Sequence, residues 1–215
     1  MLDDYTAAMK VLSNFIDGCF AAARSGDSLQ VFEPATGEHY ATVPESGRED
    51  VDEAVSAAAA AFPGWRDTPA TERSRLLVKL ADAIEANLES LARTESIDTG
   101  KPLSLARSVD IPRSAANFRF FAGAALHTSS ECHDFDGGGV PGGIRALNYT
   151  LRRARGVAGL ISPWNLPLYL LSWKIAPALA TGNTCVCKPS EVTPATAHAL
   201  CGLAREVGIP PGVLN

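Results

Sequence analysis

Three polar side chains follow short apolar runs near the end of the chain and could act on one ligand. Asn165 lies between Pro163 and Pro167, and an amide held by two prolines can donate a hydrogen bond to a developing oxyanion. Lys188 and Glu191 have a spacing suited to gripping two ribose hydroxyls, because the carboxylate accepts and the ammonium donates. The acid also disfavours a ribose 2′-phosphate, which predicts NAD rather than NADP.

Both patterns also have plainer interpretations. An Asn in a turn can bond its own backbone, and a Lys–Glu pair at this spacing can simply begin a solvated helix. The spacing alone leaves these alternatives open. No glycine-rich G-x-G-x-x-G loop follows the apolar run at residues 157–161, so the sequence does not support a standard Rossmann dehydrogenase.

These side chains need a sheet to bring them together. The apolar runs predict two strands, each followed by a helix: residues 157–161, 168–180, 184–188 and 193–208, the last capped by Thr193 and Pro194. Residues 213–215 begin a third strand. This order is typical of a parallel sheet. Because such sheets bind ligands at the carboxyl ends of their strands, the loops after residues 161 and 188 should lie side by side.

The upstream part predicts short antiparallel strands and then helices. Residues 11–20 and 29–44 carry strand patterns, the second with a turn at Gly37. Ser46 and Glu49 have capping-box spacing for a helix that ends around residues 62–65. A second helix starts at Thr68 and Pro69. The leucines between residues 76 and 91 form the apolar stripe of this second helix. The remaining elements are a helix over 110–127, a glycine-rich loop over 136–143 and a strand over 145–153.

The predicted fold class is therefore α/β: the start of a doubly wound, Rossmann-like parallel sheet, preceded by helices and an antiparallel hairpin. We expect three parts. Residues 1–135 form the N-terminal helical and hairpin part of the cofactor-binding domain, residues 136–155 a loop and a strand, and residues 156–215 the first β-α-β-α unit of an incomplete NAD-binding sheet.

Composition narrows the function classes. The chain has 215 residues, 46% of them hydrophobic and 20% charged, which is typical of a soluble globular protein. A net charge of −5 without a basic cluster makes nucleic acid an unexpected partner. The uncharged run 156–173 is interrupted by Pro163 and Pro167, so we expect no membrane span. The acidic N-terminus does not resemble a targeting signal, and we expect a cytoplasmic protein.

The five cysteines do not form a metal or disulfide pattern. They are irregularly spaced and include no C-x-x-C pair, so we expect no metal site. Cys185 and Cys187 are two apart on a predicted strand, and Cys201 lies in a predicted helix. We expect these three to be buried core thiols.

The run 156–197, with its P-W-N and K-P-S-E motifs joined by W-K-x-x-P-A-L-A-x-G-N, resembles the aldehyde dehydrogenase superfamily. The runs 14–18, 34–38, 96–102 and 149–153 agree, so the resemblance covers nearly the whole chain. Residues 110–123 and 161–178 resemble the branch that acts on aminomuconic and hydroxymuconic semialdehydes. The resemblance implies NAD-dependent oxidation of an aldehyde to a carboxylic acid through a cysteine thiolate.

The resemblance also implies roles for individual residues. Asn165 would be the amide of the oxyanion hole. Lys188 and Glu191 would hold the adenosine ribose. The residues implied to lie along NAD, four through their backbone and the last near the cofactor side of the site, are Ile161, Ser162, Pro163, Trp164 and Lys174.

A carboxylated semialdehyde would need a cationic partner in the protein. The predicted helix over residues 110–127 offers Arg113 and Arg119, which lie on different faces because they are six residues apart. Arg113 shares a face with Asn117, and we expect it to face the substrate. The alternative is that both arginines form surface or inter-helix ion pairs.

The sequence departs from the family in what it lacks. The family's nucleophilic cysteine and general-base glutamate lie downstream of K-P-S-E, and the sequence ends at Asn215. We therefore expect a fragment or short form, inactive and poorly stable alone. In this interpretation the catalytic domain is absent. Residues 144–154 resemble the family's oligomerisation-type strand, so we expect the full-length form to be a homo-oligomer. One alternative is a non-catalytic chain that associates with full-length subunits. Another is a dehydrogenase for general aliphatic aldehydes.

Overall fold

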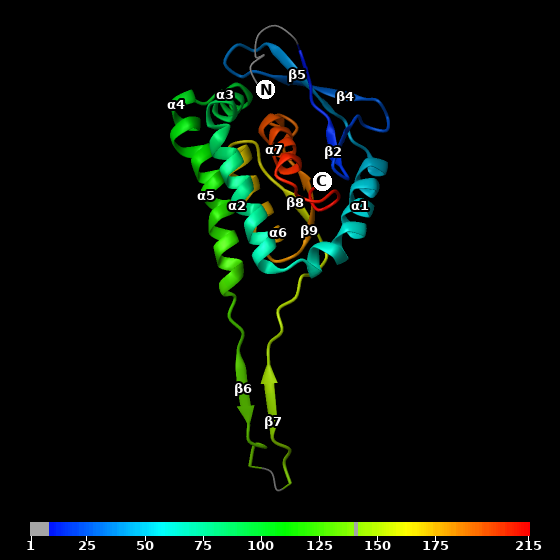
Figure 1. The fold of residues 1–215 in the computed structure, drawn as a ribbon. Helices are drawn as coiled ribbons and strands as arrows, with labels where there is room; N and C mark the ends of the chain where they lie inside the picture. The colour runs from blue at the N-terminus through cyan, green and yellow to red at the C-terminus, as the bar shows by residue number, and fades with distance from the viewer. Residues whose placement is uncertain (1–8, 140–141) are drawn as a thin grey trace.

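The computed structural model describes residues 9–139 and 142–215, and these form a mixed α/β fold (Figure 1). Its centre is the parallel pair β8 (Val157–Ile161) and β9 (Thr184–Lys188), joined by α6 (Pro167–Ala180) and followed by α7 (Ala195–Glu206). Leu214 bridges β9 in parallel at Cys185. The predicted β-α-β-α order, its strand limits and the beginning of a third parallel strand are confirmed.

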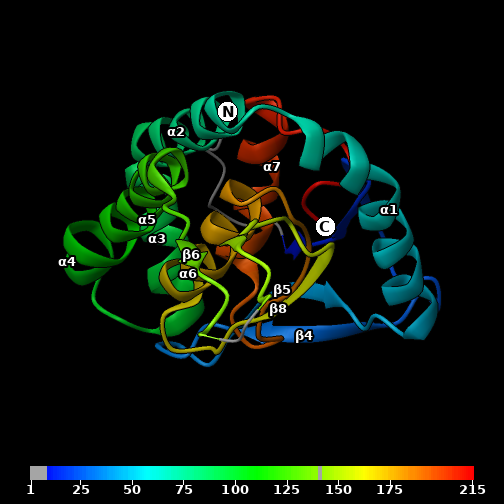
Figure 2. The same cartoon turned by 90° about the horizontal axis from the view of Figure 1, so that it is seen from below.

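Helices cover both faces of this sheet (Figure 2). The helix α1 (Arg48–Asp67) packs on one face, where Thr184 Oγ1 donates to Ala58 O at 2.9 Å. The segment that leads to Leu214 also lies close to α1, since a Cβ at Gly212 would lie 2.7 Å from Ala57 O. On the other face lie α6 and α7, backed by α2 (Ala70–Ala86) and α5 (Ile111–Ala124).

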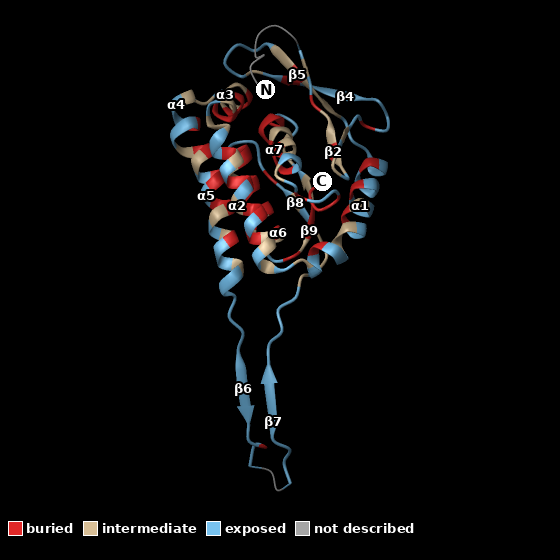
Figure 3. Ribbon diagram, in the orientation of Figure 1, coloured by how far each residue is buried: buried red, intermediate tan, exposed pale blue. Residues whose placement is uncertain are grey.

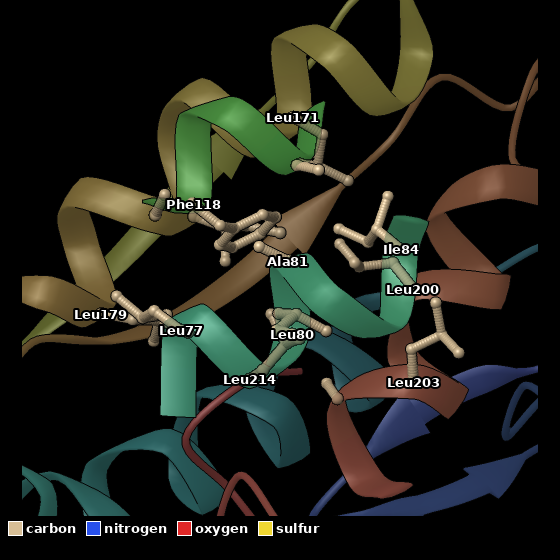
Figure 4. Packing of buried hydrophobic residues seen from close by; sticks show 14 of the residues in the cluster. Leu77, Leu80, Ala81, Ile84, Phe118, Leu171, Leu179, Leu200, Leu203 and Leu214 are labelled. Carbon is tan, nitrogen blue, oxygen red and sulfur yellow. The ribbon is translucent and has the colours of Figure 1, made fainter. Parts of the chain in front are cut away.

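The main core forms where α2, α5, α6 and α7 meet (Figure 4). Leu77, Leu80 and Ile84 recur at helical spacing along α2, so all three enter the buried cluster that also contains Phe118 of α5 and Leu200 of α7. Burying each such side chain contributes about 1.5–3 kcal/mol. This apolar layer fixes α6, and hence the loop that leads into it.

The N-terminal strands differ from the prediction in one respect. β4 (Ser28–Phe32) and β5 (His39–Pro44) form the expected antiparallel hairpin, and β1 (Lys10–Val11) adds to β5 in parallel. The single strand expected over residues 11–20 is wrong. It is divided, and β2 (Asn14–Ile16) and β3 (Cys19–Ala21) form their own hairpin. The Asp17–Gly18 dipeptide explains this, because both residues have positive φ, as a two-residue hairpin turn requires.

Three predicted helix boundaries are also wrong. α1 begins at Arg48 with Gly47 as its N-cap, and Asp50, not Glu49, accepts the cap N–H at 2.9 Å. The helix continues through Pro63 to Asp67. Thr68 does not cap the next helix, because its hydroxyl donates back to Gly64 O at 2.8 Å and so closes α1.

The predicted leucine stripe belongs to two helices. Asn87 separates α2 from α3 (Leu88–Thr99), which ends at Gly100 with a φ of 72°. A short α4 (Leu103–Leu105) and a π-helical turn η1 (Ala106–Asp110) then lead into α5, and a 3₁₀ turn η2 (Ala125–His127) closes it. The helix predicted over residues 110–127 therefore corresponds to α5 and η2.

A two-stranded arm projects from this body. β6 (Cys132–Phe135) and β7 (Ala146–Tyr149) pair antiparallel, and every residue in both strands is exposed (Figure 3). The strand predicted over residues 145–153 is shorter than expected, and its partner β6 lacks a strong sequence signal. Residues 140 and 141 of the predicted glycine-rich loop lie outside the described residues. Among the residues that are described, no helix is long and apolar enough to cross a membrane.

Candidate functional site

The two predicted loops meet at one edge of the sheet. Ile161 and Lys188 are paired at the carboxyl ends of β8 and β9. Just beyond them, the N–H of Ser162 donates to Lys188 O at 3.2 Å. The loop of residues 162–166 and the Lys188–Glu191 segment are thus neighbours, at the edge where open parallel sheets bind ligands.

Asn165 is exposed in the turn that leads into α6. Within the described part of the chain its side chain makes no hydrogen bond. The alternative of an Asn that bonds its own backbone is therefore not what the structure contains. The amide is left available to a ligand, which is what an oxyanion donor requires.

Side chains hold the backbone of this loop from three directions. Lys174 Nζ, from the next helix, donates to Ile161 O. The buried Thr193 donates its hydroxyl to Trp164 O at 3.2 Å, from the segment that precedes α7. Lys101 Nζ, which follows α3, lies 3.4 Å from Asn165 O. The loop is fixed through its carbonyls, while the side chains of Pro163, Trp164 and Asn165 stay exposed.

Lys188 and Glu191 form an ion pair that stays open to solvent. Lys188 Nζ lies 2.7 Å from Glu191 Oε2, and the two side chains are 64% and 54% exposed. The hydrogen bond from Lys188 lowers the pKa of Glu191, so the carboxylate is ionised at neutral pH. Both residues, with Ser190, line a cavity of about 470 Å³ between β2, the start of α1 and β9.

Two unsatisfied polar atoms support a nucleotide at this edge. Ser162 Oγ is buried, with the residue only 4% exposed, and Asn14 Nδ2 lies in the wall of the cavity. Neither has a hydrogen-bond partner among the described residues. Buried polar atoms are usually paired, so such orphans are expected where a ligand or water completes the site. Together with an ionised acid and exposed loop residues at Ile161, Pro163 and Trp164, they fit NAD.

A buried charge cluster of Lys101, Glu95 and Asp110 lies beside the Asn165 loop, and the sequence did not predict it. Lys101 is 10% exposed, and its ammonium lies 2.6 Å from Asp110 Oδ2 and 3.3 Å from Glu95 Oε1. Burial raises the pKa of Glu95, and Thr196 donates to that carboxylate at 2.8 Å. The available signal was the run S-I-D-T-G-K-P, in which a lysine follows a glycine that ends a helix.

Asp98 extends this cluster toward the N-terminal sheet. Tyr40 donates to its carboxylate from β5, and the N–H of Ala195 donates from the start of α7 at 2.9 Å. Burial raises the pKa of Asp98 to about 7. One buried acid thereby connects three parts of the fold.

The two arginines of α5 have different surroundings. Arg119 lies 2.7 Å from Asp82 and 2.5 Å from Glu85, both on α2, and so fits the ion-pair alternative. Arg113 has no ion pair with any described residue, and its guanidinium lies 5.1 Å from the ring centroid of Tyr169. Tyr169 is in the first turn of α6, directly after the Asn165 loop.

Of the three thiols expected to be buried, only Cys185 is, so the prediction is wrong for Cys187 and Cys201. Cys185 is fully buried, while Cys187 and Cys201 are half-buried. A hydrogen bond with Cys185, together with burial, raises the pKa of Cys187, and burial raises that of Cys201. Neither is poised to be a thiolate nucleophile at neutral pH. No group of potential ligands able to hold a metal ion occurs in the described ranges.

Comparisons with known proteins identify the family of this chain. The model of the aldehyde dehydrogenase family matches residues 20–215. A 2-aminomuconic semialdehyde dehydrogenase of Homo sapiens is 52% identical over 98% of this chain and 42% of its own length. A 2-hydroxymuconic semialdehyde dehydrogenase of Pseudomonas sp. (strain CF600) is 46% identical over 96% and 42%.

Solved structures give the same result. An NAD⁺ complex of an aldehyde dehydrogenase from Bacillus cereus superposes with a TM-score of 0.89 at 39% identity, over 96% of this chain and 41% of that one. The chain thus spans about two fifths of the length of the proteins it matches. On the family match, the identities and the shared fold, this chain belongs to the aldehyde dehydrogenase family.

Proposed function

We propose that this chain supplies the oxyanion donor and the adenosine-ribose site of an enzyme that oxidises a muconic-type semialdehyde to the acid with NAD. The observation that carries the proposal is the shared sheet edge, where the Asn165 loop and the Lys188–Glu191 pair are joined by the Ser162 N–H to Lys188 O bond of 3.2 Å. The names of the relatives support the substrate class, and the NAD⁺ complex of the Bacillus cereus enzyme supports the cofactor.

In this chemistry Asn165 stabilises charge. When a thiolate attacks the aldehyde carbon, the former carbonyl oxygen becomes an oxyanion, and the exposed amide donates to it. NAD⁺, when bound, supplies the acceptor for the hydride that leaves that carbon. Ile161, Pro163 and Trp164 would line its path, and Lys174 braces the same loop at Ile161 O. The nucleophile and the general base are not assigned to any residue of this chain.

Lys188 and Glu191 would hold the adenosine ribose of NAD. Their ion pair keeps both side chains charged and adjacent, while more than half of each stays in contact with solvent. The ionised Glu191 can accept from a ribose hydroxyl and would repel a 2′-phosphate.

Arg113 is the proposed partner of the substrate carboxylate. It is the arginine of α5 that lacks an acidic partner in the described structure, and Tyr169 holds its guanidinium beside the entry to α6. A planar guanidinium suits bidentate binding of a carboxylate. A dehydrogenase for general aliphatic aldehydes would not need this residue, so Arg113 separates the two substrate classes.

The arm favours association with other subunits as a second role. Phe135, Leu147 and Tyr149 are exposed on strands that project away from the body. Apolar side chains on an unsupported two-stranded ribbon are unfavourable in water, and a partner would cover them. The association state of the purified chain, measured by analytical ultracentrifugation, tests this: Leu147→Glu should shift the protein to a smaller species.

NAD binding by the 215-residue chain tests the cofactor site. Glu191→Gln should raise the dissociation constant about tenfold, the loss of one charge-assisted hydrogen bond. Glu72→Gln is the matched control, because Glu72 and Arg75 form an exposed ion pair of the same spacing on α2. Equal affinities for wild type and Glu191→Gln, or equal losses in both variants, would reject the assignment.

A chimera tests the chemistry. The chain is fused to the portion of the human relative that lies beyond the matched region, and NADH formation is measured. Asn165→Ala should lower kcat about 10²–10³-fold, as loss of an oxyanion donor does elsewhere, while Asn148→Ala on the exposed arm should not. Arg113→Met should raise KM for a carboxylated semialdehyde but not for an uncharged aldehyde, with Arg119→Met as the control. An Asn165→Ala chimera with full kcat would contradict the proposed role.

A further inference from the structure

The hydrogen bonds at the Asn165 loop have an unusual distribution. Two consecutive carbonyls, those of Trp164 and Asn165, accept from side chains that lie far away in the sequence, while the Asn165 amide itself is unengaged. The donors are Thr193 and Lys101. The position of the amide is therefore set by its backbone, and the backbone by residues of other elements.

The ammonium of Lys101 has all three of its donor directions used. A lysine ammonium carries three N–H groups. Those of Lys101 have acceptors at Asp110 Oδ2 (2.6 Å), Glu95 Oε1 (3.3 Å) and Asn165 O (3.4 Å). A tripod of this kind fixes the nitrogen in space, whereas a surface lysine with one partner keeps its rotational freedom.

The two carboxylates that bind the Lys101 ammonium are themselves buried in the fold. Glu95 is on α3 and is fully buried, and Asp110 ends the π-helical turn before α5 and is 2% exposed. Lys101 follows Gly100, whose left-handed backbone turns the chain sharply out of α3. The contact to Asn165 O thus connects the loop to α3 and to the turn η1 that precedes α5.

Thr193 contacts the Asn165 loop from the segment between Lys188 and α7. It is 3% exposed, its N–H donates to Ser190 O at 3.2 Å, and its hydroxyl reaches Trp164 O. The segment between Lys188 and α7 therefore contacts the Asn165 loop directly. The proposed ribose site and the proposed oxyanion site share this brace.

We propose that Lys101 and Thr193 are positioning residues of the oxyanion site: they hold the carbonyls of Asn165 and Trp164 so that the Asn165 amide keeps one orientation. This proposal rests on the proposed function of Asn165 as the oxyanion donor. Neither residue contacts the reacting atoms. Catalytic amides must be held close to the productive geometry, and a loop between two prolines resists bending but does not by itself fix where its peptide planes point.

Backbone order parameters from ¹⁵N relaxation of the 215-residue chain test the proposal. The measured amides are those of Trp164, Asn165 and Leu166, together with the side-chain NH₂ resonance of Asn165. Wild type should have values near 0.85, typical of rigid backbone. Lys101→Met should lower the order parameters of Asn165 and Leu166 below about 0.6 and shift the side-chain NH₂ resonance of Asn165 toward that of a free amide. Thr193→Val should lower the order parameters of Trp164 and Asn165 by a smaller amount, because Lys101 still holds the carbonyl of Asn165.

Two further variants separate positioning from general stability. Lys101→Arg keeps the charge and several donors, and should restore the order of the loop. Leu80→Ala weakens the core shared by α2 and its neighbours without touching the loop, and should leave all four signals unchanged. If Lys101→Met does not fold, Thr193→Val decides the matter, since it removes one hydroxyl and leaves the buried charges paired.

The proposal is overturned if the folded variants keep wild-type order parameters at all three amides. It is also overturned if Leu80→Ala loosens the loop as much as they do. Its failure is distinct from failure of the proposed function: an unchanged loop in Lys101→Met with a slow Asn165→Ala chimera would reject only the positioning role. A loosened loop with a fully active Asn165→Ala chimera would reject the function of Asn165 instead.

Discussion

Two lysine–carboxylate groups lie at the ends of the same site and have opposite characters. Lys101, with Glu95 and Asp110, is almost wholly buried, and its charges satisfy one another and one loop carbonyl. Lys188 and Glu191 use the same residue types at a similar distance, yet more than half of each side chain meets solvent. The Lys101 group makes contacts within the protein, whereas the Lys188–Glu191 pair is accessible to a ligand.

The difference shows that burial determines what an ion pair can do. A buried pair must satisfy itself, because an unpaired charge in a low-dielectric interior is costly. An exposed pair contributes little to stability, and water or a ligand can replace either partner at small cost. The exposed pair of Lys188 and Glu191 is therefore suited to binding, and the buried group of Lys101, Glu95 and Asp110 is suited to positioning.

The largest expected effect is on stability, from Lys101→Met. The change leaves Glu95 and Asp110 buried without their cation, which should lower the free energy of unfolding by about 3–5 kcal/mol. Urea denaturation followed by circular dichroism measures it. A loss below about 1 kcal/mol would mean that the two groups do not differ as described.

The second effect is a dependence on pH that arises from the buried acids, chiefly from Asp98, which extends the Lys101 cluster. The folded pKa of Asp98 is about 7, well above the value of about 3.9 of an unfolded aspartate, so the folded state binds the extra proton. This contribution is fully present below pH 4 and is lost as the pH rises through 7, amounting to up to about 4 kcal/mol. Glu95, whose pKa is also raised, acts in the same direction.

Asp98→Asn should flatten this dependence between pH 5 and 7.5, because the amide is neutral throughout and can still accept from the Ala195 N–H. Urea denaturation at both pH values measures the change. An Asp98→Asn variant whose stability falls as steeply as that of wild type would exclude Asp98 as the source.

A third effect concerns the buried group as a unit. Replacing Lys101, Glu95 and Asp110 together by Met, Gln and Asn removes the charges of both signs, so the triple variant should be more stable than Lys101→Met alone by about 2 kcal/mol or more. Thermal unfolding of both variants at one pH gives the comparison. If the triple variant is the less stable, its losses are additive and the three residues do not act together.

The smallest expected effect on stability comes from the exposed pair. Lys188→Met should change the free energy of unfolding by less than about 1 kcal/mol, while it weakens NAD binding by several fold. Measuring unfolding and NAD affinity on the same preparation sharpens the contrast with Lys101→Met. A large loss of stability would show that the Lys188–Glu191 pair also has a structural role.

How much of the fold was predictable depended on whether the signal was local. The limits of β8 and β9 follow from short apolar segments that are bounded by loop residues, and both strands were predicted to the residue. The start of α1 was not, because Ser46 and Gly47 are both acceptable caps and the choice falls to Asp50, which bonds Gly47. The turn at Asp17 and Gly18 between β2 and β3 was not predicted, because the apolar residues on either side of it have the pattern of a single strand.

The candidate site shows the same division. Asn165, Lys188 and Glu191 stand in recognisable motifs, so their types and spacing pointed to them. The roles of Lys101 and Thr193 depend on contacts to Asn165 and Trp164 from distant parts of the sequence. Arg113 and Arg119 looked alike in the sequence, and only the acids of α2 beside Arg119 distinguish them.

The sequence by itself determined the family, the parallel β-α-β unit and the chemical groups at its edge, because motifs and apolar periodicity are properties of neighbouring residues. Only the tertiary structure decided which charges are buried and which are open, and therefore which lysine positions and which can bind. Burial depends on elements that come together from the whole length of the chain. The Lys101 ammonium owes its role to α3, to the turn before α5 and to a loop more than sixty positions away.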